Sequence, residues 1–516
     1  MLQIKNLTIT HKKDLRVILE NFSMVLNPGD KAVMIGEEGN GKSTLLKYIY
    51  NPELIDDYAE AEGERVVNKE RLAYLPQELP KEDREKTIYE YFSEEPVFWE
   101  QTPKDLGKLA KNFQLDVDFF YGDQLMGTLS GGEKVKTQLM RILMTDPTVL
   151  LLDEPSNDID IETLEWLETM IREWEFAVLF ISHDETLIEN TANMIIHIEQ
   201  IKRKTQSRYT IVHMSYEEYK QNRSDLFERQ EQQALNERRE KKIKEEKFRK
   251  IQQKVEHQQN TISRQDPHGG QLLKKKMHAV KAMEHRYERE FKDMTEMPEQ
   301  EEAIFFKMGD KNSQMPAGKT VLEYTLDALY TPDGTQLLAR DIFLRVRGPE
   351  KICIIGQNGV GKTTLLHKIK EELFQREDIK VGYMPQNYEE LLQLDMTPID
   401  YLDQSGDKVE RTKIQTFLGA MKYTADEMNH PIAELSGGQK AKILLLKMSM
   451  SGVNVLILDE PTRNFSPLSN PVIRRILAEF PGAIISISHD RKYIDEVCDC
   501  VYRLTEDGLS TERFHE

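Results

Sequence analysis

Two glycine-rich loops in this sequence have the composition and spacing of a phosphate-binding loop. The loop at 36–43 reads Gly-Glu-Glu-Gly-Asn-Gly-Lys-Ser, and the loop at 356–363 reads Gly-Gln-Asn-Gly-Val-Gly-Lys-Thr. Each follows a short apolar stretch typical of a strand, at 32–35 and 352–355, and precedes a helical pattern. Glycines let backbone N–H groups converge on phosphate oxygens, and the N-terminus of the following helix adds partial positive charge. The residues expected to contact nucleotide are Gly36, Glu37, Glu38, Gly39, Asn40, Gly41, Lys42, Ser43, Thr44, Gly356, Gln357, Asn358, Gly359, Val360, Gly361, Lys362, Thr363 and Thr364.

Two residue types in each loop have a defined chemical task. Lys42 and Lys362 are expected to reach the β- and γ-phosphates of ATP. The hydroxyls of Ser43 and Thr363 are expected to bind Mg²⁺.

Acidic pairs end two apolar runs, at 149–152 and 455–458, which predict buried parallel strands. The first acid of each pair would support Mg²⁺ through its waters, and the second would orient or deprotonate the attacking water. The alternative is a structural acid at a strand end. The four acids are Asp153, Glu154, Asp459 and Glu460.

A histidine lies 29 residues after the second acid in both halves of the chain. His183 and His489 follow the strand-like runs at 178–181 and 484–487. Because both occur at the same spacing, we expect them to contact the γ-phosphate.

A Leu-Ser-Gly-Gly motif lies 23 residues before the first acid in both halves and opens a predicted helix, at 133–144 and 439–450. A helix N-terminus that begins with serine and glycines suits a phosphate group. The motif residues are Ser130, Gly131, Gly132, Glu133, Ser436, Gly437, Gly438 and Gln439.

The second motif set repeats the register of the first. Ser436, Glu460 and His489 each lie 306 residues after their counterparts. Chance matches have no reason to keep a fixed offset, so the register indicates duplicated domains. A chain with two complete sets is able to form its own ATPase pair.

Composition limits the class of protein. The 516 residues suggest about three domains, and 39% hydrophobic with 31% charged residues is typical of a globular chain. No apolar run approaches the roughly 18 residues of a membrane helix, and the N-terminus has no signal-peptide pattern. The three cysteines have no metal-ligand spacing and predict packing roles in a reducing, cytoplasmic setting.

The net charge of −19 hides a basic middle segment. From 220 to 296 there are 20 Lys and Arg residues against 14 Asp and Glu, an excess of +6, which leaves −25 for the remainder. This division indicates that the basic segment, and not the whole surface, contacts a polyanion. The alternative is a solvated face of a charge-rich helix.

The same segment predicts two long helices. Residues 216–260 lack Gly and Pro and favour a helix of about 65 Å. A breaker follows at 261–270, and apolar residues then recur three or four apart from Leu273 to Met294. The two helices are expected to pair antiparallel as a hairpin. A rigid tether between two domains is the alternative.

Together the motifs resemble the ATP-binding cassette family. That resemblance implies an α/β fold, with the signature motif of one cassette closing on nucleotide held by the other, so that two composite sites need both halves. It also implies that Gln77 and Gln386 are the family's Q-loop glutamines, which contact nucleotide and Mg²⁺. One departure concerns the loop after Glu460, which lacks the family's usual aspartate, so the two sites are not expected to be equivalent.

Tandem cassettes, a charged hairpin linker and no membrane domain resemble the ABC-F family of ribosome-acting ATPases. The resemblance implies a monomer that pairs its own cassettes, needs no obligate protein partner, and binds the 70S ribosome at the E site, where the hairpin meets peptidyl-tRNA and rRNA. Carried over, the tip is 262–271. The candidate RNA contacts are Arg264, Gln265, His268, Lys274, Lys275, Lys276, Lys281 and Arg286.

The loop Arg463-Asn-Phe-Ser-Pro-Leu-Ser-Asn-Pro looks like the branch of that family that confers resistance to lincosamides, pleuromutilins and streptogramin A. The short stretches between Q-loop and signature leave little room for the arm insertion of housekeeping members. A housekeeping translation factor, the ATPase of an exporter and a DNA-repair or chromosome-structuring ATPase are the alternatives. The predicted architecture is α/β with two P-loop cassettes, at 1–214 and 298–516, joined by an antiparallel helical hairpin at 215–297.

Overall fold

The structure, a computed structural model, describes residues 1–201, 206–261, 267–292, 294–298, 308–309, 313–403 and 405–512. The described chain forms two compact units. One comprises 1–216 and 301–516 and holds both cassettes, and the other comprises 217–300. The division 1–214, 215–297 and 298–516 drawn from the sequence stays a prediction.

The first cassette contains a six-stranded sheet in the order β5-β6-β7-β3-β8-β9, in which only the pairing of β8 with β9 is antiparallel. A second, three-stranded antiparallel sheet has the order β2-β1-β4. The strands are β1 Leu2–His11, β2 Val17–Leu26, β3 Lys31–Ile35, β4 Ala59–Val67, β5 Leu72–Leu75, β6 Val149–Asp153, β7 Ala177–Ile181, β8 Met194–Ile201 and β9 Gln206–Val212. The helices are α1 Lys42–Tyr50, α2 Ile88–Ser93, α3 Pro103–Asn112, α4 Gly131–Leu143, α5 Ile161–Glu173 and α6 Glu185–Thr191.

The second cassette repeats this topology. Its six-stranded sheet has the order β13-β14-β15-β12-β16-β17, again with one antiparallel pairing at the β17 edge, and β10 and β11 form an antiparallel pair. The strands are β10 Thr320–Tyr330, β11 Leu337–Arg347, β12 Lys351–Ile355, β13 Val381–Met384, β14 Val455–Asp459, β15 Ala483–Ile487, β16 Cys500–Thr505 and β17 Gly508–Glu512. The helices are α9 Lys362–Phe374, α10 Pro398–Leu402, α11 Lys408–Ala420, α12 Ala425–Asn429, α13 Gly437–Met450, α14 Asn470–Ala478 and α15 Arg491–Val497.

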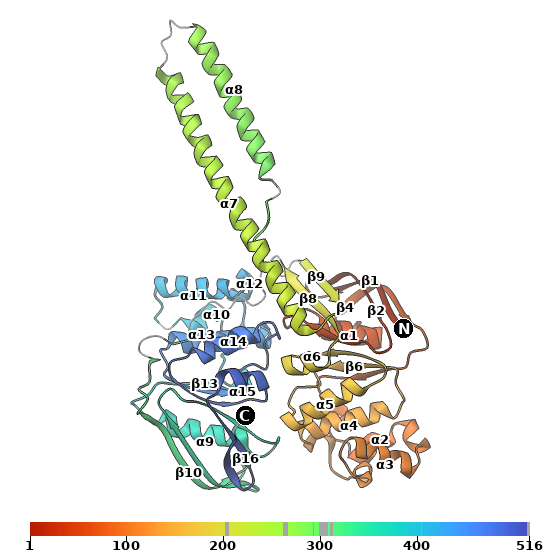
Figure 1. The fold of residues 1–516 in the computed structure, drawn as a ribbon. Coiled ribbons are helices and arrows are strands. Elements are labelled where there is room, and N and C mark those ends of the chain that lie inside the picture. Colours follow the sequence, from red (N-terminus) through yellow and green to blue (C-terminus); the bar gives the residue numbers. More distant parts are fainter. Residues whose placement is uncertain are drawn as a thin grey trace. The chain divides into compact units, whose positions relative to one another are not determined.

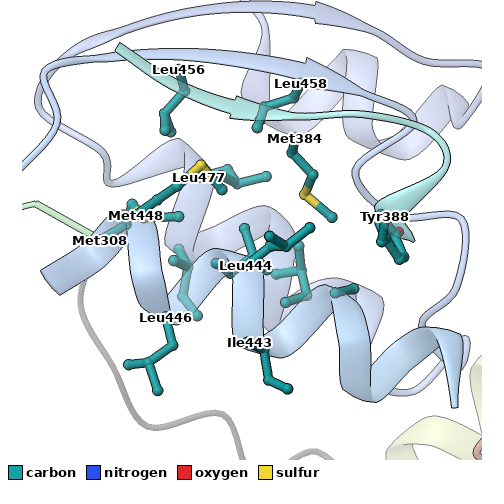
Figure 2. Close-up of a cluster of buried hydrophobic side chains, with 14 of the residues drawn as sticks. Met308, Met384, Tyr388, Ile443, Leu444, Leu446, Met448, Leu456, Leu458 and Leu477 are labelled. Atoms are coloured by element: carbon teal, nitrogen blue, oxygen red, sulfur yellow. The ribbon is translucent and has the colours of Figure 1, made fainter. Parts of the chain in front are cut away.

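The central strands are apolar along their whole length because both faces of each sheet are covered. All five residues of β6 and of β14 are buried. In the second cassette Leu456 and Leu458 of β14 lie against Leu444 and Met448 of α13 within one hydrophobic cluster (Figure 2). Burial on both faces is the usual condition of a parallel sheet, and it places the polar ends of the strands at one edge.

The segment between the cassettes forms the predicted helical hairpin. Helix α7 runs Tyr216–Thr261, 46 residues or about 69 Å, and α8 runs Pro267–Glu290 antiparallel to it (Figure 1). The rings of Phe248 and Tyr287 meet edge to face with centroids 6.4 Å apart, which joins the two helices. Helix α8 begins earlier than the sequence suggested, because Pro267 suits the first turn of a helix and Gly269 and Gly270 continue it.

Among the described residues, no helix combines the length and the apolar character needed to span a membrane.

The packing of β14 predicts a specific stability effect. Replacing fully buried Leu458 with alanine leaves a cavity against α13 and is expected to lower the free energy of unfolding by about 2–5 kcal/mol. The matched control is Leu226→Ala, because that leucine is 64% exposed. Thermal melting of both variants checks this, and equal melting temperatures would contradict it.

Candidate nucleotide sites

Each glycine-rich loop joins the end of a buried strand to the start of a helix, β3 to α1 and β12 to α9. At Gly36 the backbone φ is +141°, and a Cβ atom there would lie 2.2 Å from the carbonyl oxygen of Ile198. At Gly356 a Cβ would lie 2.5 Å from the carbonyl oxygen of Leu504. Only glycine fits such a backbone, so the path of both loops is fixed by the neighbouring strand.

The loop lysines are buried and turned into their own loops. The Nζ atom of Lys42 donates to the carbonyl oxygens of Gly36 and Glu37, at 2.7 and 3.0 Å. Lys362 Nζ makes the equivalent bonds to Gly356 and Gln357 at the same distances. Both ammonium groups therefore lie inside the loop, at the position expected for a bound phosphate group.

A hydroxyl and a carboxylate meet beside each loop. Ser43 Oγ donates to Asp153 Oδ1 at 2.9 Å, and Thr363 Oγ1 donates to Asp459 Oδ2 at 3.0 Å. Burial raises the pKa of both carboxyl groups, that of Asp459 to about 6. Hydroxyl and carboxylate oxygens are ligands that Mg²⁺ accepts together with nucleotide phosphates. The described residues contain no cluster of three or more His, Cys, Asp or Glu that would hold a metal ion without such phosphates.

In the first cassette the carboxylate of Glu154 is held by three side chains. Gln77 Nε2 donates at 3.0 Å and Asn157 Nδ2 at 2.5 Å, and His183 Nε2 lies 3.2 Å from Glu154 Oε1. Burial by itself raises the pKa of Glu154, but the charge of His183 and then that of Lys42 outweigh it and bring the pKa to about 2. Glu154 is therefore an ionised acceptor in a fixed position.

In the second cassette Glu460 has fewer partners. The backbone N–H of His489 donates to Glu460 Oε2 at 3.3 Å, and buried Oε1 has no hydrogen-bond partner in the described part of the chain. Burial and then the charge of Asp459 raise the pKa of Glu460 to about 8. Burial and then Lys362 lower the pKa of His489 to about 3, so its ring is neutral near pH 7. The two glutamates thus differ in both partners and protonation.

The signature motifs form the N-termini of α4 and α13, and each motif serine caps its helix. Ser130 and Glu133 form a reciprocal capping box, as do Ser436 and Gln439. A cavity of about 700 Å³ lies between the first cassette's signature and the second cassette's glycine-rich loop. That volume is within the roughly 300–1,000 Å³ of small-molecule sites. Its lining includes Ser130, Gly131, Lys362, Thr363, Glu460 and His489.

In the opposite combination, acidic side chains of the loop contact the signature helix. The backbone N–H of Gly438 donates to Glu38 Oε2 at 2.8 Å, and Lys442 Nζ lies 3.4 Å from Glu37 Oε1. A pocket of about 30 Å³ lies beside these contacts.

Asp158 connects the cassettes at the larger cavity. It belongs to none of the motifs from which the site residues were predicted. Gln386 Nε2 donates to its Oδ1 at 3.1 Å, and Arg463 donates to its Oδ2 at 2.8 Å. Asn358 Nδ2 donates to its backbone carbonyl at 2.5 Å. The structure therefore places Gln386 against the other cassette, whereas Gln77 contacts Glu154 of its own cassette.

Two ion pairs join the cassettes beside these sites. Arg474 Nη1 lies 2.6 Å from Glu185 Oε1, and these side chains are 3% and 1% exposed. Arg491 pairs with Glu168. Arg491 and Arg474 lie 306 residues after Glu185 and Glu168, so the two pairs use equivalent positions with the charges exchanged. Reading charge reversals within the 306-residue register would have found them from sequence.

The candidate RNA contacts belong to the hairpin. Lys274, Lys275, Lys276, Lys281 and Arg286 are exposed on α8. Arg264 and Gln265 lie outside the described residues, and His268 belongs to the first turn of α8.

Comparison with known proteins finds one family in both cassettes. A family model described as ABC transporter matches residues 19–157 and 339–463. The ribosome protection protein VmlR of Bacillus subtilis is 27% identical, over 99% of this chain and 88% of its own length. ABC transporter F family member 5 of Arabidopsis thaliana is 25% identical, over 95% and 73%.

A solved structure shows the same fold. It is the complex of archaeal ribosomal stalk protein aP1 and archaeal ribosome recycling factor aABCE1, with a TM-score of 0.57 at 16% identity, covering 98% of this chain and 90% of the matched chain.

The buried ion pair gives a prediction about cassette association. Arg474→Ala leaves Glu185 buried without its main partner. We expect this change to lower the free energy of unfolding by about 3–5 kcal/mol. The expected result is a lower melting temperature and a greater separation of fluorophores placed on the two cassettes. Arg475→Ala, on the exposed side of α14, is the matched control. Arg474→Lys, which keeps a positive charge beside Glu185, should lose less stability than Arg474→Ala; identical behaviour of the Arg474 and Arg475 variants would contradict the role of the pair.

Proposed function

This chain belongs to the ATP-binding cassette family, whose ABC transporter domain it carries twice, and we propose that it is an ABC-F ATPase that acts on the ribosome. The observation that carries this proposal is the basic hairpin of α7 and α8 between two cassettes that together form composite nucleotide sites. Relatives that match nearly the whole chain include a ribosome protection protein, which supports the ribosome as partner.

The residues around the larger cavity fit ATP hydrolysis. We assign phosphate binding to the loop amides and Lys362, with Ser130 and Gly131 closing on the nucleotide from the other cassette. We assign to Glu460 the orientation of the attacking water and, in its ionised form, the deprotonation of that water, and to His489 contact with the γ-phosphate. Mg²⁺ would be held by Thr363 and Asp459, where it would offset phosphate charge. In the first cassette Lys42, Ser43, Asp153, Glu154 and His183 have the equivalent assignments.

ATP binding and hydrolysis would then determine how much of the protein is in a closed state and how much is in an open state. ATP held by both cassettes favours the closed state, and a ligand shifts such an equilibrium only by its difference in affinity for the two states. We propose that the closed state binds the ribosomal E site and that hydrolysis reopens the cassettes and releases the protein.

The hairpin is the element proposed to meet RNA. Lysine and arginine side chains are exposed along α8, and cations near phosphates are sufficient for binding because structured RNA is recognised largely through shape and backbone. We propose that the hairpin shifts peptidyl-tRNA and nearby rRNA so that lincosamide, pleuromutilin or streptogramin A antibiotics leave. VmlR, the relative that supports this, is a ribosome protection protein.

A housekeeping factor that relieves stalled ribosomes is the second candidate. The observation in its favour is that identity to VmlR, 27%, is little higher than the 25% to a plant F family member. Both candidates use the same ATPase and differ in whether drug is displaced.

The composite sites predict that blocking hydrolysis traps the ribosome-bound state. Glu154→Gln with Glu460→Gln should lower ATP turnover by about 10²–10⁴-fold and keep the protein on 70S ribosomes during sedimentation with ATP. Glu165→Gln with Glu479→Gln, at exposed positions, is the matched control and should release normally. Absence of the trapped protein from every ribosomal fraction would reject the ribosome as partner.

The hairpin predicts a charge-dependent phenotype. Reversal of Lys274, Lys275 and Lys276 to glutamate replaces phosphate attraction with repulsion, so ribosome affinity should fall by at least about tenfold. Cells expressing the wild-type chain should tolerate more lincosamide and tiamulin than cells expressing this variant. Glutamates at Lys104, Lys108 and Lys111, exposed on α3, make the same charge change away from the hairpin. Unchanged susceptibility with the wild-type chain would favour the housekeeping function.

A further inference from the structure

An acidic side chain of the first cassette lies at an unusual place, against the signature helix of the second cassette. Glu38, third residue of the first glycine-rich loop, accepts a hydrogen bond of 2.8 Å from the backbone N–H of Gly438. A Cβ atom on Gly437 would lie 3.1 Å from the same carboxylate. The carboxylate of Glu38 is therefore bound at the N-terminus of α13, the 14-residue signature helix of the other cassette.

The second glycine-rich loop has a different residue and contact at the equivalent position. Asn358 donates its side-chain N–H to the backbone carbonyl of Asp158, beside the first cassette's signature helix. A carboxylate has no N–H to donate, so Glu38 cannot make that bond to the other cassette and accepts one from the signature helix instead. A single residue difference thus changes what each loop presents to the facing signature.

The position of Glu38 has a chemical meaning in a composite site. The N-terminus of a helix favours anions, and in the proposed ATP sites the anion facing the signature is the terminal phosphate of the nucleotide. The adjacent Glu37 pairs with Lys442 of the same signature helix, with Nζ and Oε1 3.4 Å apart. A pocket of about 30 Å³ lies beside these two contacts.

We propose that Glu38 stands in for the γ-phosphate at the signature helix of the second cassette. The site at Lys42 then accepts a nucleoside diphosphate while the cassettes are apposed, and it accepts a triphosphate only when Glu38 withdraws. The site at Lys362 has Asn358 in place of this acid and selects ATP. This inference rests on the composite sites proposed above and adds to them a residue that determines nucleotide specificity.

The test measures each site alone in the full-length chain. Lys362→Ala removes nucleotide binding at the second loop, and titration with fluorescent (mant) ATP and ADP then reports the first loop. Without further change, ADP should bind more tightly than ATP. Glu38→Asn, which installs the residue found at 358, should raise ATP affinity by about tenfold because the competing anion is gone, and should change ADP affinity less than about twofold. Glu38→Gln keeps the length of the side chain and should give most of the same gain.

The reciprocal experiment transfers the property. In a Lys42→Ala background, Asn358→Glu should lower ATP affinity at the second loop by about tenfold and leave ADP affinity within about twofold. Equal changes for ATP and ADP in either background would overturn the inference, because they would indicate a general effect on the loop. So would a first site that prefers ATP in the presence of Glu38. Failure of the wild-type chain to bind either nucleotide would instead reject the composite sites, and the inference with them.

Discussion

Both proposed nucleotide sites need two apposed cassettes, and buried ion pairs join the cassettes. Arg474 and Glu185 are almost completely removed from solvent, where an unpaired charge costs several kcal/mol and a paired one is tolerated only with good geometry. This makes the contact sensitive to small displacements. These pairs join α5 and α6 of the first cassette to α14 and α15 of the second.

Within that frame the two sites have diverged in the groups around their acids. Glu154 receives bonds from Gln77 and Asn157, whereas Glu460 accepts one backbone bond and its Oε1 lies 3.7 Å from His489 Nε2. The difference arises because Gln386 is directed to Asp158 across the interface. Duplicated motifs therefore do not imply duplicated chemistry, and the partners of each acid decide how it behaves.

Local pattern was sufficient for most of the fold. The strands before the glycine-rich loops, the signature helices and the helix at 216–261 agree with expectation within a residue or two, because apolar runs and helix-forming composition act over short distances. The ion pairs and the contact of Glu38 join residues about 290 to 400 positions apart, and no periodicity reports such contacts. The start of α8 was misjudged because two glycines suggested a loop, whereas Pro267 before them favours a first helical turn.

The exchanged charges also limit how these domains can be used separately. Cassette 1 supplies the acids, Glu168 and Glu185, and cassette 2 supplies the bases, Arg474 and Arg491. Two copies of the first cassette would bring acid against acid at both positions, and two copies of the second would bring base against base. The two cassettes are thus complementary halves, and a chain divided within the hairpin is expected to reassemble as a heterodimer.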